Sequence, residues 1–277
     1  HFGIVASGCM DQLSFCISNK LVGNNIFEGA LEFAYQGPLL ELVGESALLA
    51  ISGKVNFNII NKNGETKQGS PNQSFVISNG DKIDILSTIN SVYGYLSIMG
   101  GFKLKEIKGS VSTLVRAKIG PNNGDKLKNN DKIFFNKSNS TNKPKKIQFD
   151  FDKDNTIRVM KGLQVDYFTK ESQENFFSKE YEITRLTDRM GMRLQGEKLK
   201  NAVNKNIKSE GITKGSIQIP GDGQPIVLLS DHPTIGGYPK IANVISADYD
   251  KLVQKTPGTK IKFKLVDLAV AENAFQD

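Results

Sequence analysis

The segment from Gly236 to Lys240 reads Gly-Gly-Tyr-Pro-Lys and combines residue types that can bind a negatively charged oxygen. Two adjacent glycines, Gly236 and Gly237, can adopt positive φ, which turns successive backbone N–H groups toward one point and forms an anion-binding nest. The hydroxyl of Tyr238 and the ammonium of Lys240 are further donors for a carboxylate, a carbonyl oxygen or a developing oxyanion. A glycine-rich turn that only joins its two strands is the alternative. The loop is longer than such a connection needs, which favours a binding function.

A second candidate site lies in the sequence "RLTDRMGMRLQG", which begins at Arg185 and has arginines at every fourth position. That spacing would give a helix one basic face, but the alternation of "YEITRL" before it and Gly191 within it favour a strand, a turn and a strand. Asp188 and Arg189 then lie in the turn. There the forked guanidinium can grip a carboxylate while Asp188 holds the arginine in place. A purely structural Asp–Arg pair is the alternative.

Several other chemistries lack the residues that they need. The histidines are His1 and His232, and no Cys/His spacing surrounds either, so we expect no metal site. The chain has no G-x-x-x-x-G-K-[ST] motif, so we expect no P-loop nucleotide site. A nucleophilic Cys9 would need a histidine that the neighbouring sequence does not supply, and a small packed thiol is the simpler interpretation.

Composition narrows the possible partners and the compartment. Two cysteines in 277 residues make no disulfide framework, which indicates a reducing cytoplasm. No apolar run is long enough to span a membrane, so we expect no membrane partner. The formal charge is +7, but the lysines are spread along the chain without a stacking or groove-reading motif. We therefore expect no nucleic-acid partner.

The elements that position these residues are mostly strands. Short runs rich in Ile, Val, Phe and Tyr alternate in polarity, as is typical of strands. These runs are LEFAY, VNFNII, SFVI, IDIL, YGYLSI, IQF, IRVM, YEITRL, SIQI, PIVLL and IKFKLV. A turn followed by a similar strand opening recurs in "NGDKIDIL" (79–86), "NNDKIFF" (129–135) and "PGTKIKFKL" (257–265). The sequence therefore predicts a mainly β fold of sandwich or barrel topology with a few short helices.

Helical signals are clearest in two segments. Residues 10–24 carry an apolar stripe, with Asp11 near the start and Gly23 at the end. Residues 246–258 open on a serine and stop before Pro257. The polar segment 136–148 lacks an apolar period and indicates a linker or long loop. We therefore expect an N-terminal β subdomain (1–135), the linker (136–148) and a C-terminal β-barrel subdomain (149–277).

Long ordered motifs covering nearly the whole chain resemble one known family. They are GIVASGCMDQLSFCISNKLVGN (3–24), GLQVDYF (162–168), LTDRMGMRLQG (186–196) and GSIQIPGDGQPIVLLSDHPTIGGYPKIANVISADYDKLVQKTPG (215–258). The family is that of the C subunit of bacterial 5-oxoprolinase, also called allophanate hydrolase subunit 2 or the carboxyltransferase domain of urea carboxylase-type enzymes.

The resemblance implies two β-barrel-like halves of cyclophilin type in a cytoplasmic hydrolase component that is inactive alone. The implied reaction is ATP-dependent opening of 5-oxoproline to glutamate, together with the 5-oxoprolinase subunits A and B. ATP is used by the complex, and no cofactor is expected on this chain itself. Two alternatives remain open: a carboxyltransferase component of a urea or amide carboxylase that uses biotin on a partner, and a regulatory binding partner of a protein like the B subunit.

The family pattern also extends the set of candidate site residues. The residues expected to act on the substrate are Arg189, Tyr238 and Lys240. Those expected to bind the small amide substrate are Asp11, Asn19, Asp188, Gln224, Asp231, Thr234, Gly236 and Gly237. The chain departs from the family at Pro233, where a glutamine is usual, and at Cys9, where an alanine is more usual. The family's opening segment is expected to precede His1.

Overall fold

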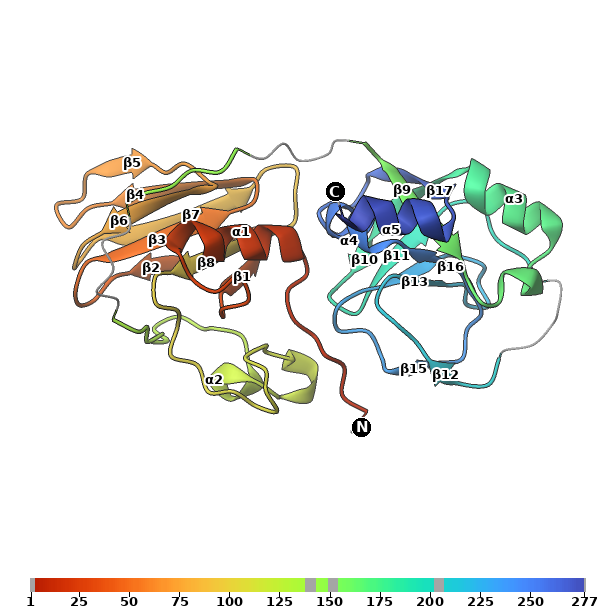
Figure 1. The fold of residues 1–277 in the computed structure, drawn as a ribbon, viewed down its shortest axis with the longest axis horizontal. Helices are drawn as coiled ribbons and strands as arrows, with labels where there is room; N and C mark the ends of the chain where they lie inside the picture. Colours follow the sequence, from red (N-terminus) through yellow and green to blue (C-terminus); the bar gives the residue numbers. More distant parts are fainter. Residues whose placement is uncertain (1–2, 138–142, 149–153, 202–206, 277) are drawn as a thin grey trace. The chain divides into compact units, whose positions relative to one another are not determined.

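The computed structural model describes residues 3–137, 143–148, 154–201 and 207–276. The chain divides into two compact units (Figure 1). Residues 11–150 form the first, called here the sheet unit, and residues 1–10 with residues 151–277 form the second, called the barrel unit. The linker expected at 136–148 remains a prediction, and residues 138–142 of it lie outside the described residues.

Two four-stranded antiparallel sheets make up most of the sheet unit. Their strand orders are β1-β8-β3-β6 and β2-β7-β4-β5. The strands are β1 (Leu31–Ala34), β2 (Leu39–Glu41), β3 (Ala47–Ser52), β4 (Val55–Ile60), β5 (Thr66–Gln68), β6 (Gln73–Ile77), β7 (Lys82–Thr88) and β8 (Tyr93–Ile98). Ile51 and Leu96 of the first sheet and Phe57 and Ile85 of the second belong to one buried cluster. The two sheets therefore pack face to face around a shared apolar core.

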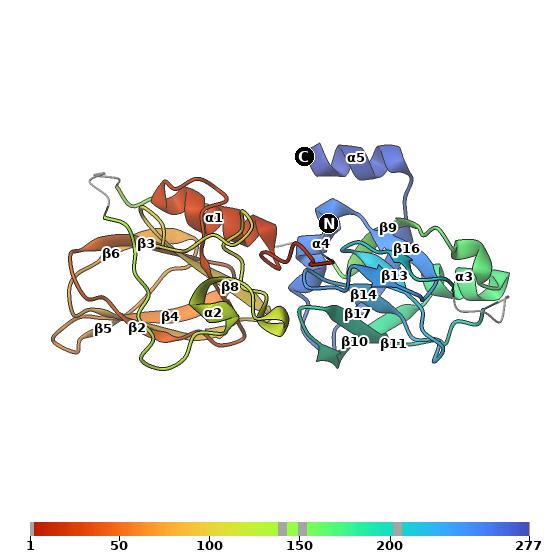
Figure 2. The same ribbon diagram turned by 90° about the horizontal axis from the view of Figure 1, so that it is seen from below.

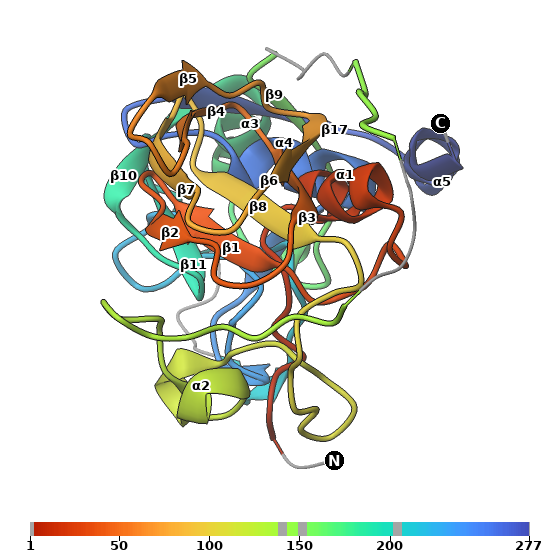
Figure 3. The ribbon, with the colours of Figure 1, turned by 90° about the vertical axis from the view of Figure 1, so that its left-hand side faces the viewer.

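A single well-capped helix, α1 (Gln12–Val22), covers the other face of the first sheet (Figure 3). Asp11 is its N-cap, and its carboxylate accepts a hydrogen bond from a first-turn N–H. Gly23 ends the helix in the left-handed conformation, at φ 81°. On the buried side of the helix, Leu21 packs against Leu48 of β3. The helix predicted within residues 10–24 is confirmed with both of its caps.

Regular structure is sparse between β8 and the end of the sheet unit. The described helical turns there are η1 (Val115–Ala117) and α2 (Pro121–Gly124). The strand opening predicted at 129–135 is wrong: the segment contributes only one isolated bridge, between Phe135 and Phe102. Phe135 instead packs its side chain against the sheet core. Core packing therefore accounts for two apolar residues of this run, Ile133 and Phe135. A strand would have required a continuous partner backbone beside it.

Seven strands of the barrel unit close into a barrel with the order β10-β11-β14-β13-β16-β9-β17. The strands of this unit are β9 (Thr156–Lys161), β10 (Glu180–Thr187), β11 (Gly191–Gln195), β12 (Glu210–Gly211), β13 (Ser216–Gln218), β14 (Ile226–Leu228), β15 (Ile235–Gly236), β16 (Lys240–Val244) and β17 (Lys260–Leu265). Only β9 and β17 pair in parallel among the described barrel strands. Strands β12 and β15 pair separately as a short ribbon. The predicted mainly β fold with a barrel is confirmed.

Alternating apolar residues fill the barrel. Ile157 and Val159 of β9, Ile183 of β10, and Ile261 and Phe263 of β17 have no exposed surface. Polar residues at the intervening positions of β17 face outward, as the burial pattern of that strand shows. The period of two that predicted these strands is therefore the period of burial in the barrel wall.

Short helices surround the barrel. They are η2 (Val165–Tyr167), α3 (Lys170–Ser178), α4 (Ser246–Val253) and α5 (Leu268–Gln276), and Figure 2 shows α5 at the periphery of the unit. The ring of Phe176 in α3 stacks on that of Phe263, with centroids 4.7 Å apart. The predicted helix at 246–258 is confirmed as α4, although it ends at Val253. No helix in the described ranges has both the length and the apolar character to cross a bilayer.

Candidate functional site

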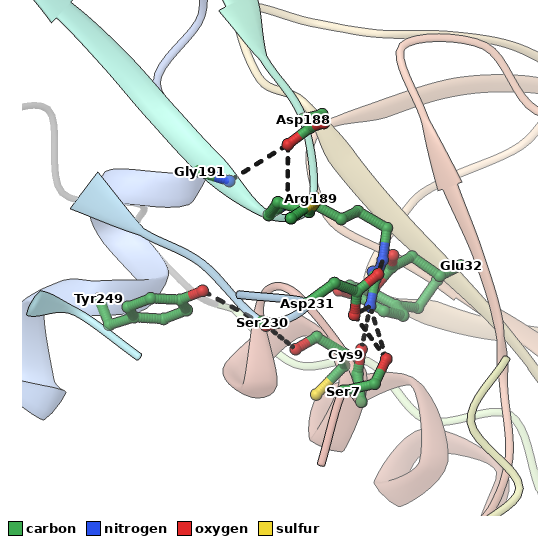
Figure 4. Close-up of polar contacts among 12 residues, drawn as sticks. Ser7, Cys9, Glu32, Asp188, Arg189, Gly191, Ser230, Asp231 and Tyr249 are labelled. Atoms are coloured by element: carbon green, nitrogen blue, oxygen red, sulfur yellow. Dashed lines mark hydrogen bonds and ion pairs between the residues drawn. The ribbon is translucent and has the colours of Figure 1, made fainter. Parts of the chain in front are cut away.

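The turn between β10 and β11 has the geometry that the sequence predicts, but Asp188 has a different role (Figure 4). Its Oδ1 accepts hydrogen bonds from the backbone N–H groups of Met190, at 2.8 Å, and Gly191, at 3.1 Å. The carboxylate therefore closes an Asx turn. We expected Asp188 to hold the Arg189 side chain. That expectation is wrong, because the backbone of the turn already uses the carboxylate.

Arg189 instead grips the carboxylate of Asp231. Its Nε donates to Oδ2 at 2.8 Å and its Nη2 donates to Oδ1 at 3.0 Å. Two predicted site residues thus meet in a bidentate pair, and the side chain of Asp231 is only 10% exposed. The Nη2 group also donates to the carbonyl of Gly8 at 2.6 Å, and the Ser7 hydroxyl donates to Asp231 at 2.5 Å. Arg189 and Asp231 therefore anchor the segment before α1 to the barrel.

The anchored segment has an unusual backbone. Ser7 has φ 55° and Gly8 has φ 97°, both in the left-handed region. Next to them the hydroxyl of Ser230 donates to the carbonyl of Cys9 at 3.0 Å and lies 3.3 Å from the hydroxyl of Tyr249 (Figure 4). Burial raises the pKa of Tyr249, so this phenol stays protonated near neutral pH. The cluster is thus a hydrogen-bonded clamp on residues 7–9.

The anion-binding nest predicted at Gly236 and Gly237 is not formed, since neither glycine has positive φ. Gly236 belongs to the β12–β15 ribbon, where it pairs with Glu210 in extended conformation. Because Gly236 has no side chain, the side chain of Gln218 can lie close to its backbone. A Cβ on Gly236 would lie 2.6 Å from Nε2 of Gln218, closer than real contacts allow. The glycine therefore makes room for a glutamine amide beneath the ribbon.

Lys240, at the start of β16, is a buried cation with one ionic partner. Its side chain is 4% exposed, and its Nζ forms an ion pair with Oε1 of Glu210, whose side chain is 40% exposed. The same Oε1 accepts a hydrogen bond from Nε2 of Gln164 at 2.9 Å. Oε1 of Gln164 in turn accepts from the backbone N–H of Lys240 at 3.2 Å. These residues, together with Gln218, form a second polar cluster that we call the Lys240 cluster.

The Lys240 ammonium, and next the Gln164 amide, hold the pKa of the Glu210 carboxyl below its ordinary value. Stabilisation from this pair is therefore present at neutral pH and is lost as the pH falls through the lowered pKa of Glu210. We expect Lys240→Met to raise the Glu210 pKa toward that of an ordinary glutamate, because the largest stabilising contact of the carboxylate disappears. A carbon-detected NMR titration of the side-chain carboxyl measures this shift. An unchanged pKa would contradict the pairing.

The remaining predicted residues of the barrel unit are distributed as follows. Tyr238 is 42% exposed, and the carbonyl of Thr234 accepts the N–H of Ile212 where the ribbon begins. Gln224 bonds both backbone groups of Gly196, at 2.9 and 3.1 Å. Its amide therefore ties two loops of the barrel unit together.

Two further predicted residues belong to the sheet unit. Asp11 caps α1, as described above. Asn19 is fully buried in the same helix, and its Nδ2 donates to the carbonyl of Glu28 at 2.8 Å. Both side chains thus hold local backbone in place.

Three members of the Lys240 cluster were missed in the sequence, namely Gln164, Glu210 and Gln218. Gln218 had a usable signal, because it is a polar residue within the apolar run "SIQI". Glu210 had none, since it lies in the unremarkable polar stretch "KSEGITKG" and meets Lys240 only through the fold. In the described ranges, no group of three His, Cys, Asp or Glu side chains is placed to hold a metal ion.

Comparisons with known proteins give a consistent result. The family model for "Carboxyltransferase domain, subdomain A and B" matches residues 2–265. The chain is 31% identical over 276 residues to the C subunit of 5-oxoprolinase from Escherichia coli (strain K12), covering 99% of this chain and 87% of the relative. It is 32% identical over 278 residues to the C subunit of 5-oxoprolinase from Haemophilus influenzae, covering 98% and 86%.

A solved structure agrees with the sequence matches. The crystal structure of Kluyveromyces lactis urea carboxylase superimposes with a TM-score of 0.87 and 30% identity. The match covers 98% of this chain and 26% of that one, so this chain spans about a quarter of that protein's length.

Proposed function

Because this chain belongs to the family of carboxyltransferase domains with subdomains A and B, we propose that it is the C subunit of an ATP-dependent 5-oxoprolinase. The observation that carries the proposal is its length match to two relatives of that name, which it covers over 87% and 86%. In the proposed reaction water opens the ring amide of 5-oxoproline to give glutamate while ATP is hydrolysed. Subunits A and B complete the enzyme, and this chain alone has no turnover.

The Lys240 cluster supports a role in handling the substrate. The substrate 5-oxoproline is an anion, and a fixed cation in a water-poor setting binds a negatively charged group strongly. Lys240 has the required burial, and its partner Glu210 is partly exposed and can exchange for a ligand oxygen. Tyr238, which is also partly exposed, lies two residues earlier in the chain. We assign Lys240 and Tyr238 to substrate contact in this proposal.

Arg189 has a different part in the proposal. Its guanidinium is committed to Asp231 and to the carbonyl of Gly8, so it acts as a positioning residue. Through these contacts it holds the backbone of Ser7 and Gly8 in the left-handed conformation. The planar fork makes two parallel bonds to one carboxylate, which an ammonium cannot copy.

A carboxyltransferase component is the second candidate, and the similarity to urea carboxylase favours it. In that case a carboxyl group would pass from biotin, carried by a partner, to an amide nitrogen. The same cluster would serve both reactions, since each needs a compact amide to be bound and polarised.

The test is reconstitution with the subunits A and B of the same organism. We expect glutamate to be released from 5-oxoproline and ATP by the three-protein mixture, and each single omission to abolish release. A folded, associated complex without turnover would overturn the proposal. The next assay would then be carboxyl transfer from a biotinylated partner to urea.

A further inference from the structure

One buried side-chain donor in the Lys240 cluster, Nε2 of Gln218, lacks a hydrogen-bond partner among the described residues. Gln218 is 5% exposed, and its Nε2 has no acceptor within the part of the chain that the structure describes. Burying an amide donor without an acceptor is costly, whereas a leucine of similar size would avoid the cost. Such a group therefore requires an explanation. One explanation is that an oxygen of a bound ligand accepts its hydrogen bond.

The unpaired amide lies where a ligand of Lys240 would bind. Gln218 and Lys240 are directly opposite each other in the β13–β16 ladder, so their side chains share a face of the sheet. The Nε2 also lies against Gly236, on the side of that residue where a Cβ would point. Glu210 is the ladder partner of Gly236, so its side chain leaves the ribbon toward the same side. The amide of Gln218 and the carboxylate of Glu210 thus face the same small region.

Glu210 shows which chemistry this region accepts. One of its carboxylate oxygens receives both the Lys240 ammonium and the Gln164 amide. Its side chain is 40% exposed, and it is carried by a ribbon only two residues long on each strand. A carboxylate from solution offers Lys240 and Gln164 the same contacts, and its second oxygen can also accept from Gln218. An external carboxylate can therefore replace Glu210 and satisfy the orphaned donor.

We propose that Lys240, Gln164 and Gln218 form a binding site for the carboxylate of a small ligand, and that Glu210 occupies this site when the ligand is absent. The proposal depends on the proposed function only for the choice of ligand, which is the carboxylate of 5-oxoproline. Gln218 is then a substrate-binding residue, and the carboxylate of Glu210 competes with the ligand carboxylate for the same donors.

The test is a titration of the 277-residue chain with two probes, in which ligand-observed NMR measures binding. The probes are 5-oxoproline and 2-pyrrolidinone, which has the same ring amide but no carboxylate. We expect 5-oxoproline to bind and 2-pyrrolidinone not to bind. In Glu210→Gln, the weaker neutral competitor should make 5-oxoproline bind about tenfold more tightly, because charge-assisted hydrogen bonds are the stronger ones.

A second variant separates recognition from folding. Gln218→Leu should weaken 5-oxoproline binding about tenfold while its melting temperature stays equal or rises, since the unpaired buried amide is gone. Gln195→Leu, at an exposed position of β11, is the matched control and should leave binding unchanged. Equal affinity in Gln218→Leu and the unchanged chain would overturn the proposal. Binding of 2-pyrrolidinone as tight as that of 5-oxoproline, or no binding even by Glu210→Gln, would do the same.

These outcomes are separate from those of the reconstitution test. If the complex that contains Gln218→Leu turns over 5-oxoproline with unchanged rate and KM, the proposed function is supported and the proposed carboxylate site is contradicted. If the chain binds the carboxylate with the expected variant effects but the reconstituted complex is inactive, the site is supported and the proposed function is contradicted.

Discussion

Lys240→Met is expected to reduce glutamate release by the reconstituted complex by about 100-fold or more, the usual effect of removing one partner of a buried, charge-assisted contact. Methionine replaces the four-atom apolar stem of the buried lysine and omits the ammonium, so packing is largely preserved. Glu210 loses its ionic partner, but at 40% exposure its carboxylate remains hydrated. The melting temperature should therefore change little, and the loss should appear in turnover.

The matched control is Lys262→Met, which removes an exposed ammonium from β17 and should leave both turnover and melting temperature unchanged. Full turnover by Lys240→Met would contradict the assignment of Lys240 to substrate contact. A large fall in its melting temperature, with a proportional loss of folded complex, would show instead that the lost turnover comes from lost folding and not from lost substrate contact.

Local signals account for what the sequence predicts well. The residues that cap α1, Asp11 and Gly23, act within one turn of the helix, so the chain itself displays both ends. The strands of the barrel alternate because each separates an apolar interior from solvent, and that pattern is also local. The strand predicted at 129–135 shows the limit of this argument. Ile133 and Phe135 of this segment do pack against the core, but pairing depends on a neighbour that the segment itself does not specify.

The geometry predicted for the Gly-Gly loop was wrong for a related reason. A glycine in a sequence can mean positive φ or a close neighbour, and the two meanings cannot be distinguished without knowing what lies opposite. For Gly236 the neighbour is Gln218, and the pairing partner is Glu210. Both contacts arise from closure of the barrel and from the ribbon beside it. The nest prediction failed because it treated this loop as isolated.

The arginine fork was predicted to grip a carboxylate of the substrate, with a structural Asp–Arg pair as the alternative. In the structure Arg189 binds the carboxylate of Asp231, 42 residues away in the chain, which is a pair of the alternative kind with another aspartate than Asp188. Contact of Arg189 with a substrate stays a prediction. Asp188 was the nearest acid in sequence, yet a short side chain at a turn first satisfies the backbone around it. Long-range pairs of this kind follow from the fold, so the sequence alone predicts the residue types and not the pairs.

The largest stability effect is expected at Asp248, in the first turn of α4. This carboxylate is 1% exposed and accepts a hydrogen bond from the Nη2 of Arg158 at 2.6 Å and another from the backbone N–H of the same residue, also at 2.6 Å. Lys251 lies one turn later, with its Nζ 3.7 Å from Oδ2. The two contacts with Arg158 join α4 to strand β9 of the barrel, so Asp248 is a central support of that junction.

Asp248→Ala should lower the free energy of unfolding by about 3–5 kcal/mol, the usual cost of removing one partner of a buried ion pair. The guanidinium of Arg158 and its N–H would be left without their acceptor in a partly buried place. Urea and thermal denaturation followed by circular dichroism measure the loss. Glu174→Ala, an exposed acid in α3, is the control and should shift stability by less than about 0.5 kcal/mol. If Asp248→Ala unfolded at the same urea concentration as this control, the ion pair with Arg158 would contribute nothing to the stability of the barrel unit.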